Sequence, residues 1–168
     1  MKVAILTMFS GLSSTYSLVG VVADQLEMLL SHDIPVKLLV SEYCPDTERP
    51  GIFSDGRIEW VKIKSSIDGN QIELYDYSNP ESKLHKTFYS EAKFFAGEFE
   101  KALSDVDVCI MHDILYQGAH YVHNIAIRMA QKNLPNVRFL SFSHSLPDKR
   151  PLHVGEEMSG RYTPMPNT

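Results

Sequence analysis

Three polar segments, each directly after an apolar run, hold residue types that bind substrates and transfer protons. They are Ser10-Gly11, His112-Asp113 with Tyr116, and Ser143-His144-Ser145. An imidazole beside carboxylates and hydroxyls can exchange a proton, hydrogen-bond a hydroxyl or stabilise developing charge. The alternative for His144 is a structural histidine, satisfied by backbone groups at the end of a strand. The segments form one candidate site if the fold brings them together.

The apolar runs themselves are typical of strands that are buried on both faces of a parallel sheet. Strands are expected at 2–8, 36–40, 58–63, 106–111 and 137–142, and helices at 18–31, 83–103 and 118–132. This alternation predicts an α/β fold, a doubly wound, Rossmann-like parallel sheet with helices on both faces. Ligands of such sheets bind outside the carboxyl ends of the strands, where the three polar segments fall.

The domain organisation follows from where this periodicity is lost. Residues 1–144 are expected to form one Rossmann-like domain, in which 41–80 is an irregular insertion around an edge strand. Residues 145–168 hold four prolines and two glycines and no periodic segment, which predicts an irregular tail. We therefore expect the chain to be truncated before a further, C-terminal domain.

Composition and charge exclude several classes of protein. The net charge is −5, with 43% apolar and 22% charged residues, the proportions of an ordinary globular domain. No stripe of Lys and Arg is present to bind nucleic acid, and no apolar stretch reaches the roughly twenty residues of a transmembrane segment. The sequence predicts a cytoplasmic protein with no nucleic-acid partner. A disulfide between Cys44 and Cys109 is neither required nor excluded.

The loop that holds Ser10 and Gly11 precedes a predicted helix, whose N-terminus favours an anionic group such as phosphate. The loop lacks the glycine patterns of dinucleotide-binding and P-loop sites. The alternative is that Ser14 or Thr15 caps the helix.

Metal and hydrolase chemistry are weaker interpretations of the same residues. His112 and Asp113 with His120 and His123 match no metal-ligand spacing, and a polar helix surface explains the last two as well, so no metal is predicted. A Ser–His–Asp arrangement of Ser10, His144 and Asp113 lacks the nucleophile elbow. The phenylalanines of the second helix, Phe88, Phe95 and Phe99, are expected to pack in the core.

The segments 2–8, 25–40, 105–113 and 139–146, in this order, resemble the N-terminal half of retaining GT-B glycosyltransferases of the family 4 type. The resemblance covers most of the chain up to His144. It implies two facing Rossmann-like domains, of which this chain is the acceptor-side one. The nucleotide-diphosphate sugar is then a donor substrate held mainly by the other domain, and no further cofactor is implied.

The resemblance also implies roles for individual residues. The Ser-x-His pattern of Ser141, Ser143 and His144 makes His144 the catalytic cleft histidine that contacts the transferring sugar. The His112-Asp113 segment becomes an acceptor-side wall that Tyr116 shares. Ser10, Gly11, Ser143 and Ser145 remain substrate contacts.

Two departures from the family pattern matter. Gly11 stands alone where the family has a pair of glycines, and the family's C-terminal glutamates and donor-binding cations are not found in the chain. We therefore expect sugar transfer from a nucleotide sugar to an acceptor hydroxyl, with retention, that these residues alone do not complete. The alternative is a non-catalytic, flavodoxin-like binding or interaction domain, and a weaker third interpretation is a hydrolase that uses His112, Asp113 and His144.

Overall fold

A computed structural model of the chain describes residues 1–75, 77, 83–115 and 118–144. The strands are β1 (Val3–Leu6), β2 (Val36–Ser41), β3 (Ile58–Ile63), β4 (Ser66–Ile67), β5 (Asn70–Gln71), β6 (Val108–His112) and β7 (Arg138–Phe142). The α-helices are α1 (Ser17–Ser31), α2 (Phe88–Leu103) and α3 (Tyr121–Asn133), and the short 3₁₀ helices are η1 (Gly51–Ser54) and η2 (Gly118–His120).

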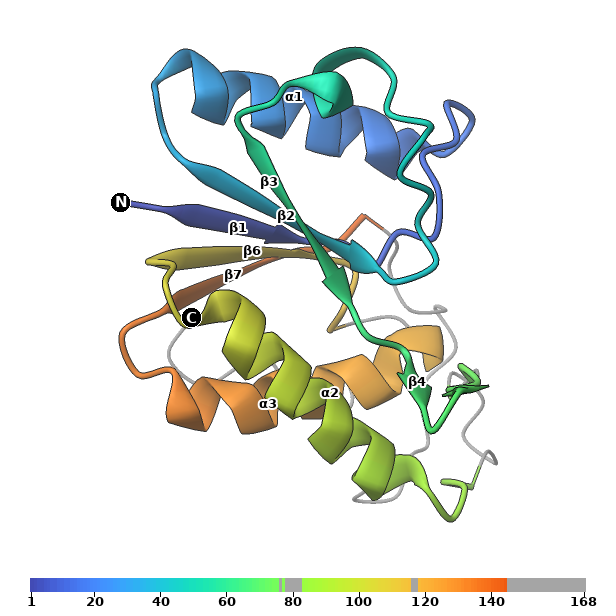
Figure 1. Cartoon of the computed structure of the whole chain (residues 1–168). Helices are drawn as coiled ribbons and strands as arrows, with labels where there is room; N and C mark the ends of the chain where they lie inside the picture. Colours follow the sequence, from blue (N-terminus) through green and yellow to red (C-terminus); the bar gives the residue numbers. More distant parts are fainter. Residues whose placement is uncertain (76, 78–82, 116–117, 145–168) are drawn as a thin grey trace.

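The main sheet has five parallel strands in the order β3-β2-β1-β6-β7 within the described residues (Figure 1). The strand order reverses at β1, which lies between β2 and β6. This reversal places a topological switch point at the carboxyl ends of β1 and β6. The predicted doubly wound, Rossmann-like α/β fold is confirmed.

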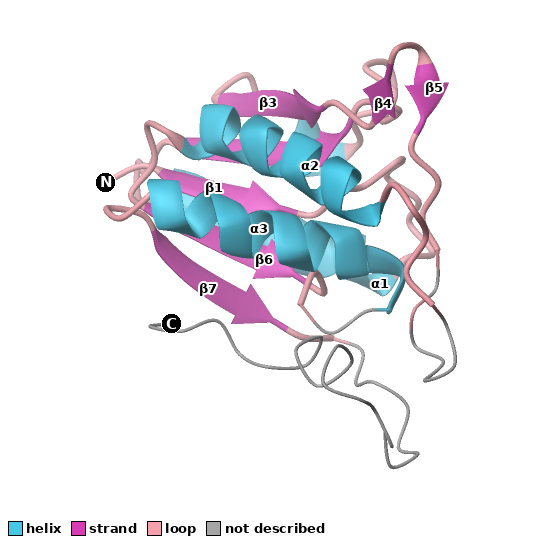
Figure 2. Ribbon diagram, turned by 90° about the horizontal axis from the view of Figure 1, so that it is seen from below, coloured by secondary structure: helices cyan, strands magenta, loops and turns pink. Residues whose placement is uncertain are grey.

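Helices cover both faces of the sheet, with α1 on one side and α2 and α3 on the other (Figures 1 and 2). Successive side chains of β1 alternate between the two layers, so that Val3 and Ile5 pack toward α1 while Ala4 and Leu6 pack toward α2 and α3.

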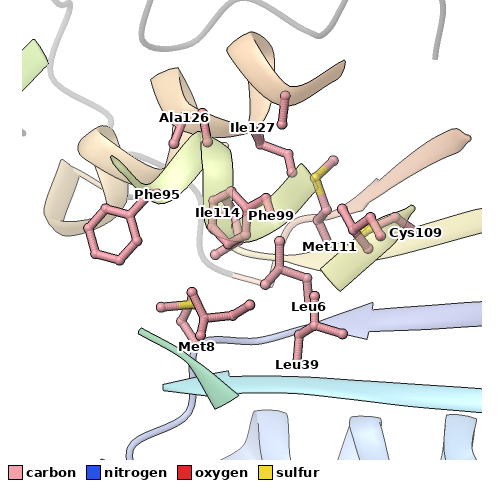
Figure 3. Packing of buried hydrophobic residues seen from close by; sticks show 14 of the residues in the cluster. Leu6, Met8, Leu39, Phe95, Phe99, Cys109, Met111, Ile114, Ala126 and Ile127 are labelled. Atoms are coloured by element: carbon pink, nitrogen blue, oxygen red, sulfur yellow. The ribbon is translucent and has the colours of Figure 1, made fainter. Parts of the chain in front are cut away.

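Aromatic side chains fill the larger of the two cores. Phe88, Phe95 and Phe99 are fully buried there, as predicted, and Figure 3 shows Phe95 and Phe99 close to Leu6, Met8 and the side chains of β6.

The predicted start of α2 at residue 83 is wrong, because the helix begins at Phe88. Two side-chain hydrogen bonds hold the segment before the helix against its first turn. Nε2 of His85 lies 2.7 Å from the Glu91 carboxylate, and the Thr87 hydroxyl donates to Glu91 at 2.6 Å. Leu84 still packs against the core, but from the segment before the helix. The apolar spacing before Phe88 thus indicates which side chains are buried, and not that the backbone there is helical.

The other departures are small. The predicted helix at 118–132 is the 3₁₀ turn η2 followed by α3, and the insertion at 41–80 holds η1 and the β4–β5 hairpin besides the edge strand β3. Cys44 and Cys109 are both free and buried, and they belong to the cores on opposite faces of the sheet. No helix in the described part of the chain is long and apolar enough to cross a membrane.

Candidate functional site

A pair of histidines lies at the carboxyl ends of β6 and β7. His112 is the last residue of β6 and is 1% exposed. His144 lies two residues after the end of β7 and is exposed. Nδ1 of His112 lies 2.8 Å from Nε2 of His144. From helix α1, which covers one face of the sheet, Oε1 of Gln25 lies 2.8 Å from Nε2 of His112. Three segments that are distant in the sequence therefore meet at this edge of the sheet.

These contacts fix the direction of the hydrogen bonds. Burial, and after it the nearby His144, lowers the pKa of His112 to about 4, so this ring is neutral at pH 7. The oxygen of Gln25 only accepts, so Nε2 of His112 donates to it and Nδ1 of His112 must accept from His144. His144 is then held by its Nε2–H group, and its Nδ1 is left for another partner.

Asp113 positions the backbone of His144. The N–H group of Asp113 donates to the carbonyl oxygen of Phe142 at 2.9 Å. Oδ1 of Asp113 accepts from the N–H group of His144 at 2.7 Å. The backbone of Asp113 is left-handed, with φ of 57°, which turns the chain sharply after β6. A carboxylate bound to the backbone differs from a catalytic triad, in which the carboxylate orients the imidazole ring.

Ser10 and Gly11 line a separate pocket of about 370 Å³ beyond the carboxyl ends of β1 and β2. The charge of Asp113, beside the histidine pair, acts on two residues of this pocket, Tyr16 and His120. Burial raises the pKa of Tyr16, and the negative charge of Asp113 adds to that rise. Burial lowers the pKa of His120, and Asp113 partly opposes this shift.

The predicted helix cap by Ser14 or Thr15 is wrong. Helix α1 begins at Ser17, and Tyr16 occupies the cap position without a side-chain hydrogen bond. The Thr15 hydroxyl, one residue before this cap position, instead pairs with the Ser13 hydroxyl at 2.8 Å.

The interpretation of His123 as part of a polar helix surface is also wrong, whereas His120 is half-buried in η2, ahead of the helix. His123 is 1% exposed, its ring packs edge-on against Phe95 with centroids 4.4 Å apart, and its Nδ1 lies 3.1 Å from Nδ1 of His120. Both histidines line the pocket, where His123 is buried and His120 is half-buried. Within the described ranges, no group of three or more His, Cys, Asp or Glu residues is arranged to hold a metal ion.

Two of the predicted site residues, Tyr116 and Ser145, lie outside the described residues. Ser143 is exposed beside His144. Sequence reasoning missed Gln25 as a site residue, although it lies three residues after Val22 and four before Leu29 on the apolar face of α1. A polar residue at such a position signals a buried hydrogen bond.

Comparison with known proteins adds no identification: no protein-family model matches the chain, and no curated protein matches it significantly.

Proposed function

We propose that this chain is the acceptor-side domain of a retaining glycosyltransferase, which moves a sugar from a nucleotide-diphosphate donor to an acceptor hydroxyl. The observation that carries the proposal is the placement of His144. It is exposed at the carboxyl end of β7, close to the switch point, and is held both through its ring and through its backbone. An exposed side chain with two such restraints is suited to contact a substrate in one orientation.

The electrostatics of the edge are compatible with this chemistry. Transfer develops positive charge on the sugar and negative charge on the leaving phosphate. Neutral His112 adds no repulsive positive charge beside the sugar, and because His144 uses its Nε2 with His112, its Nδ1 is left to hydrogen-bond a sugar hydroxyl.

The test is sugar transfer by the polypeptide at its full natural length. A change of His144→Ala removes the proposed sugar contact and is expected to lower turnover at least a hundredfold while the melting temperature changes little, because the side chain is exposed. His32→Ala, a change of an exposed histidine that follows α1, is the matched control. Unchanged turnover in His144→Ala would remove the assignment of this residue.

The alternative, a flavodoxin-like binding domain without catalysis, gives a different outcome in the same experiments. It predicts no sugar transfer by the full-length polypeptide from any of the common nucleotide-diphosphate sugars. NMR titration of residues 1–168 with these donors would then leave the resonances of His144 unshifted.

A further inference from the structure

One residue that lines the pocket of Ser10 and Gly11 has a buried polar atom that no described residue satisfies. His123 lies in α3, is 1% exposed, and uses its Nδ1 with His120. Its Nε2 is buried and has no hydrogen-bond partner among the described residues. Leaving such an atom unpaired is destabilising, so a native structure rarely keeps one without a role. His123 lines the pocket, but its Nε2 lies beneath the wall, so a ligand supplies the missing partner only when the ring turns toward the pocket.

The shape and lining of the pocket suit a small ring with both polar and apolar faces. Its volume of about 370 Å³ falls within the roughly 300–1,000 Å³ of small-molecule sites. Phe9, Tyr16 and Tyr43 contribute aromatic surface, and Leu74 adds an aliphatic side chain. Ser10 supplies an exposed hydroxyl at the same wall.

The electrostatics of the pocket disfavour an anionic ligand. No Lys, Arg, Asp or Glu is found among the described residues that line it. Burial lowers the pKa values of His120 and His123, so both rings are neutral at pH 7. The charges that act on the lining residues are carboxylates, since Asp113 acts on Tyr16 and the neighbouring Glu42 contributes to the raised pKa of Tyr43, after desolvation. A phosphate or carboxylate on the ligand would meet repulsion without a compensating cation.

We propose that this pocket binds an uncharged, polyhydroxylated ring, with one ligand hydroxyl hydrogen-bonded to Nε2 of His123. The further step, that this ring is the acceptor of the transfer reaction, rests on the function proposed above. The acceptor class is then a neutral glycoside or cyclitol, in contrast to a sugar phosphate or an acidic sugar.

Direct binding to the 168-residue chain tests the inference without a donor. The probes are methyl α-glucopyranoside, methyl α-mannopyranoside and myo-inositol, each compared by NMR titration with a phosphorylated form, and the two glycosides also with their uronates. We expect at least one neutral probe to shift the resonances of His123 and Tyr43, and its charged forms to bind at least tenfold more weakly. Equal or tighter binding of the charged forms, or no shift at the pocket with any probe, would overturn the inference.

Two variants separate the hydrogen bond from the charge argument. His123→Phe retains an aromatic ring against Phe95 but lacks Nε2, and is expected to weaken the neutral probe at least tenfold, with His32→Phe as the control. Tyr43→Lys changes a side chain that is 45% exposed, so folding is retained and a cation enters the pocket wall. It is expected to reverse the preference toward the phosphorylated probe. An unchanged preference in Tyr43→Lys would contradict the charge argument even if His123→Phe does not fold.

The two proposals fail in different experiments. If neutral rings bind at His123 but the full-length polypeptide transfers no sugar, the pocket stands and the transferase assignment fails. If the polypeptide transfers sugar only to phosphorylated or acidic acceptors, the transferase assignment stands and the inference about the pocket is wrong.

Discussion

One hydrogen bond joins His112 to His144. Which nitrogen of the buried His112 ring carries the proton therefore determines which nitrogen of the exposed His144 ring donates to it. Gln25, in helix α1, places this proton on Nε2 of His112, because its Oε1 atom can only accept a hydrogen bond. A residue of α1 thus selects which nitrogen of His144 is available to a substrate.

A change of Gln25→Glu tests this chain of contacts. A carboxylate 2.8 Å from the ring favours the protonated form, so the pKa of His112 is expected to rise from about 4 by about one to three units. The measurement is an NMR titration of the imidazole nitrogens. Met28→Glu places the same charge on an exposed position of α1 and should leave this pKa unchanged. A pKa of His112 that stays at about 4 in Gln25→Glu would show that the two side chains are not in contact in solution.

At the scale of the elements, α1 and α2 each contain a glycine whose missing side chain has no structural use. A Cβ atom added at Gly20 or Gly97 would meet no other atom within 4 Å. Replacing either by Ala reduces the conformational freedom of the unfolded chain without strain in the helix.

Gly97→Ala is therefore expected to raise the free energy of unfolding by about 0.5–1 kcal/mol, measured by urea denaturation. Gly69→Ala is the matched contrast, because φ of 80° at this position disfavours any residue with a side chain. The opposite ranking of the two variants would show that space and backbone conformation do not govern these positions.

The elements differ in how far the sequence predicts them. The interior strands β1, β2 and β6 are continuous apolar runs buried on both faces, and their positions were predicted to within a few residues. The His112–His144 contact follows from neighbouring parallel strands, because His112 pairs in register with Phe142, two residues before His144.

The pocket could not be predicted in the same way. Tyr43, Gln71 and Leu74 come from the insertion, which has no periodicity to place its side chains. Ser10 and Gly11 were predicted as site residues, but which residues line the rest of their pocket is decided by tertiary packing that the sequence pattern does not indicate.

At the scale of the whole molecule, buried neutral histidines make stability depend on pH. Burial lowers the pKa values of His112, His120 and His123 below their ordinary value of 6.5. Below pH 6.5 the unfolded chain binds protons that the folded chain excludes, so stability is present above this pH and is lost as the pH falls toward 4.

The expected outcome is a melting temperature that falls by roughly 5 °C or more between pH 7 and pH 5, measured by calorimetry. Asp55 and Asp105 do not contribute in this range, because ion pairs hold their pKa values at about 2 and both stay ionised. His123→Phe removes one of the three groups and should make the dependence shallower. A melting temperature that is constant from pH 7 to pH 5 would mean that these rings are accessible to protons in the native state.

The two free cysteines offer a way to time the opening of each layer separately. Cys44 lies in the core under α1 and Cys109 in the core under α2 and α3, and burial raises the pKa of both thiols. A thiol reagent can therefore modify either one only after its layer has opened. Equal labelling rates would identify a single cooperative event, whereas faster labelling of Cys44 would show that α1 detaches while the aromatic core on the other face stays closed.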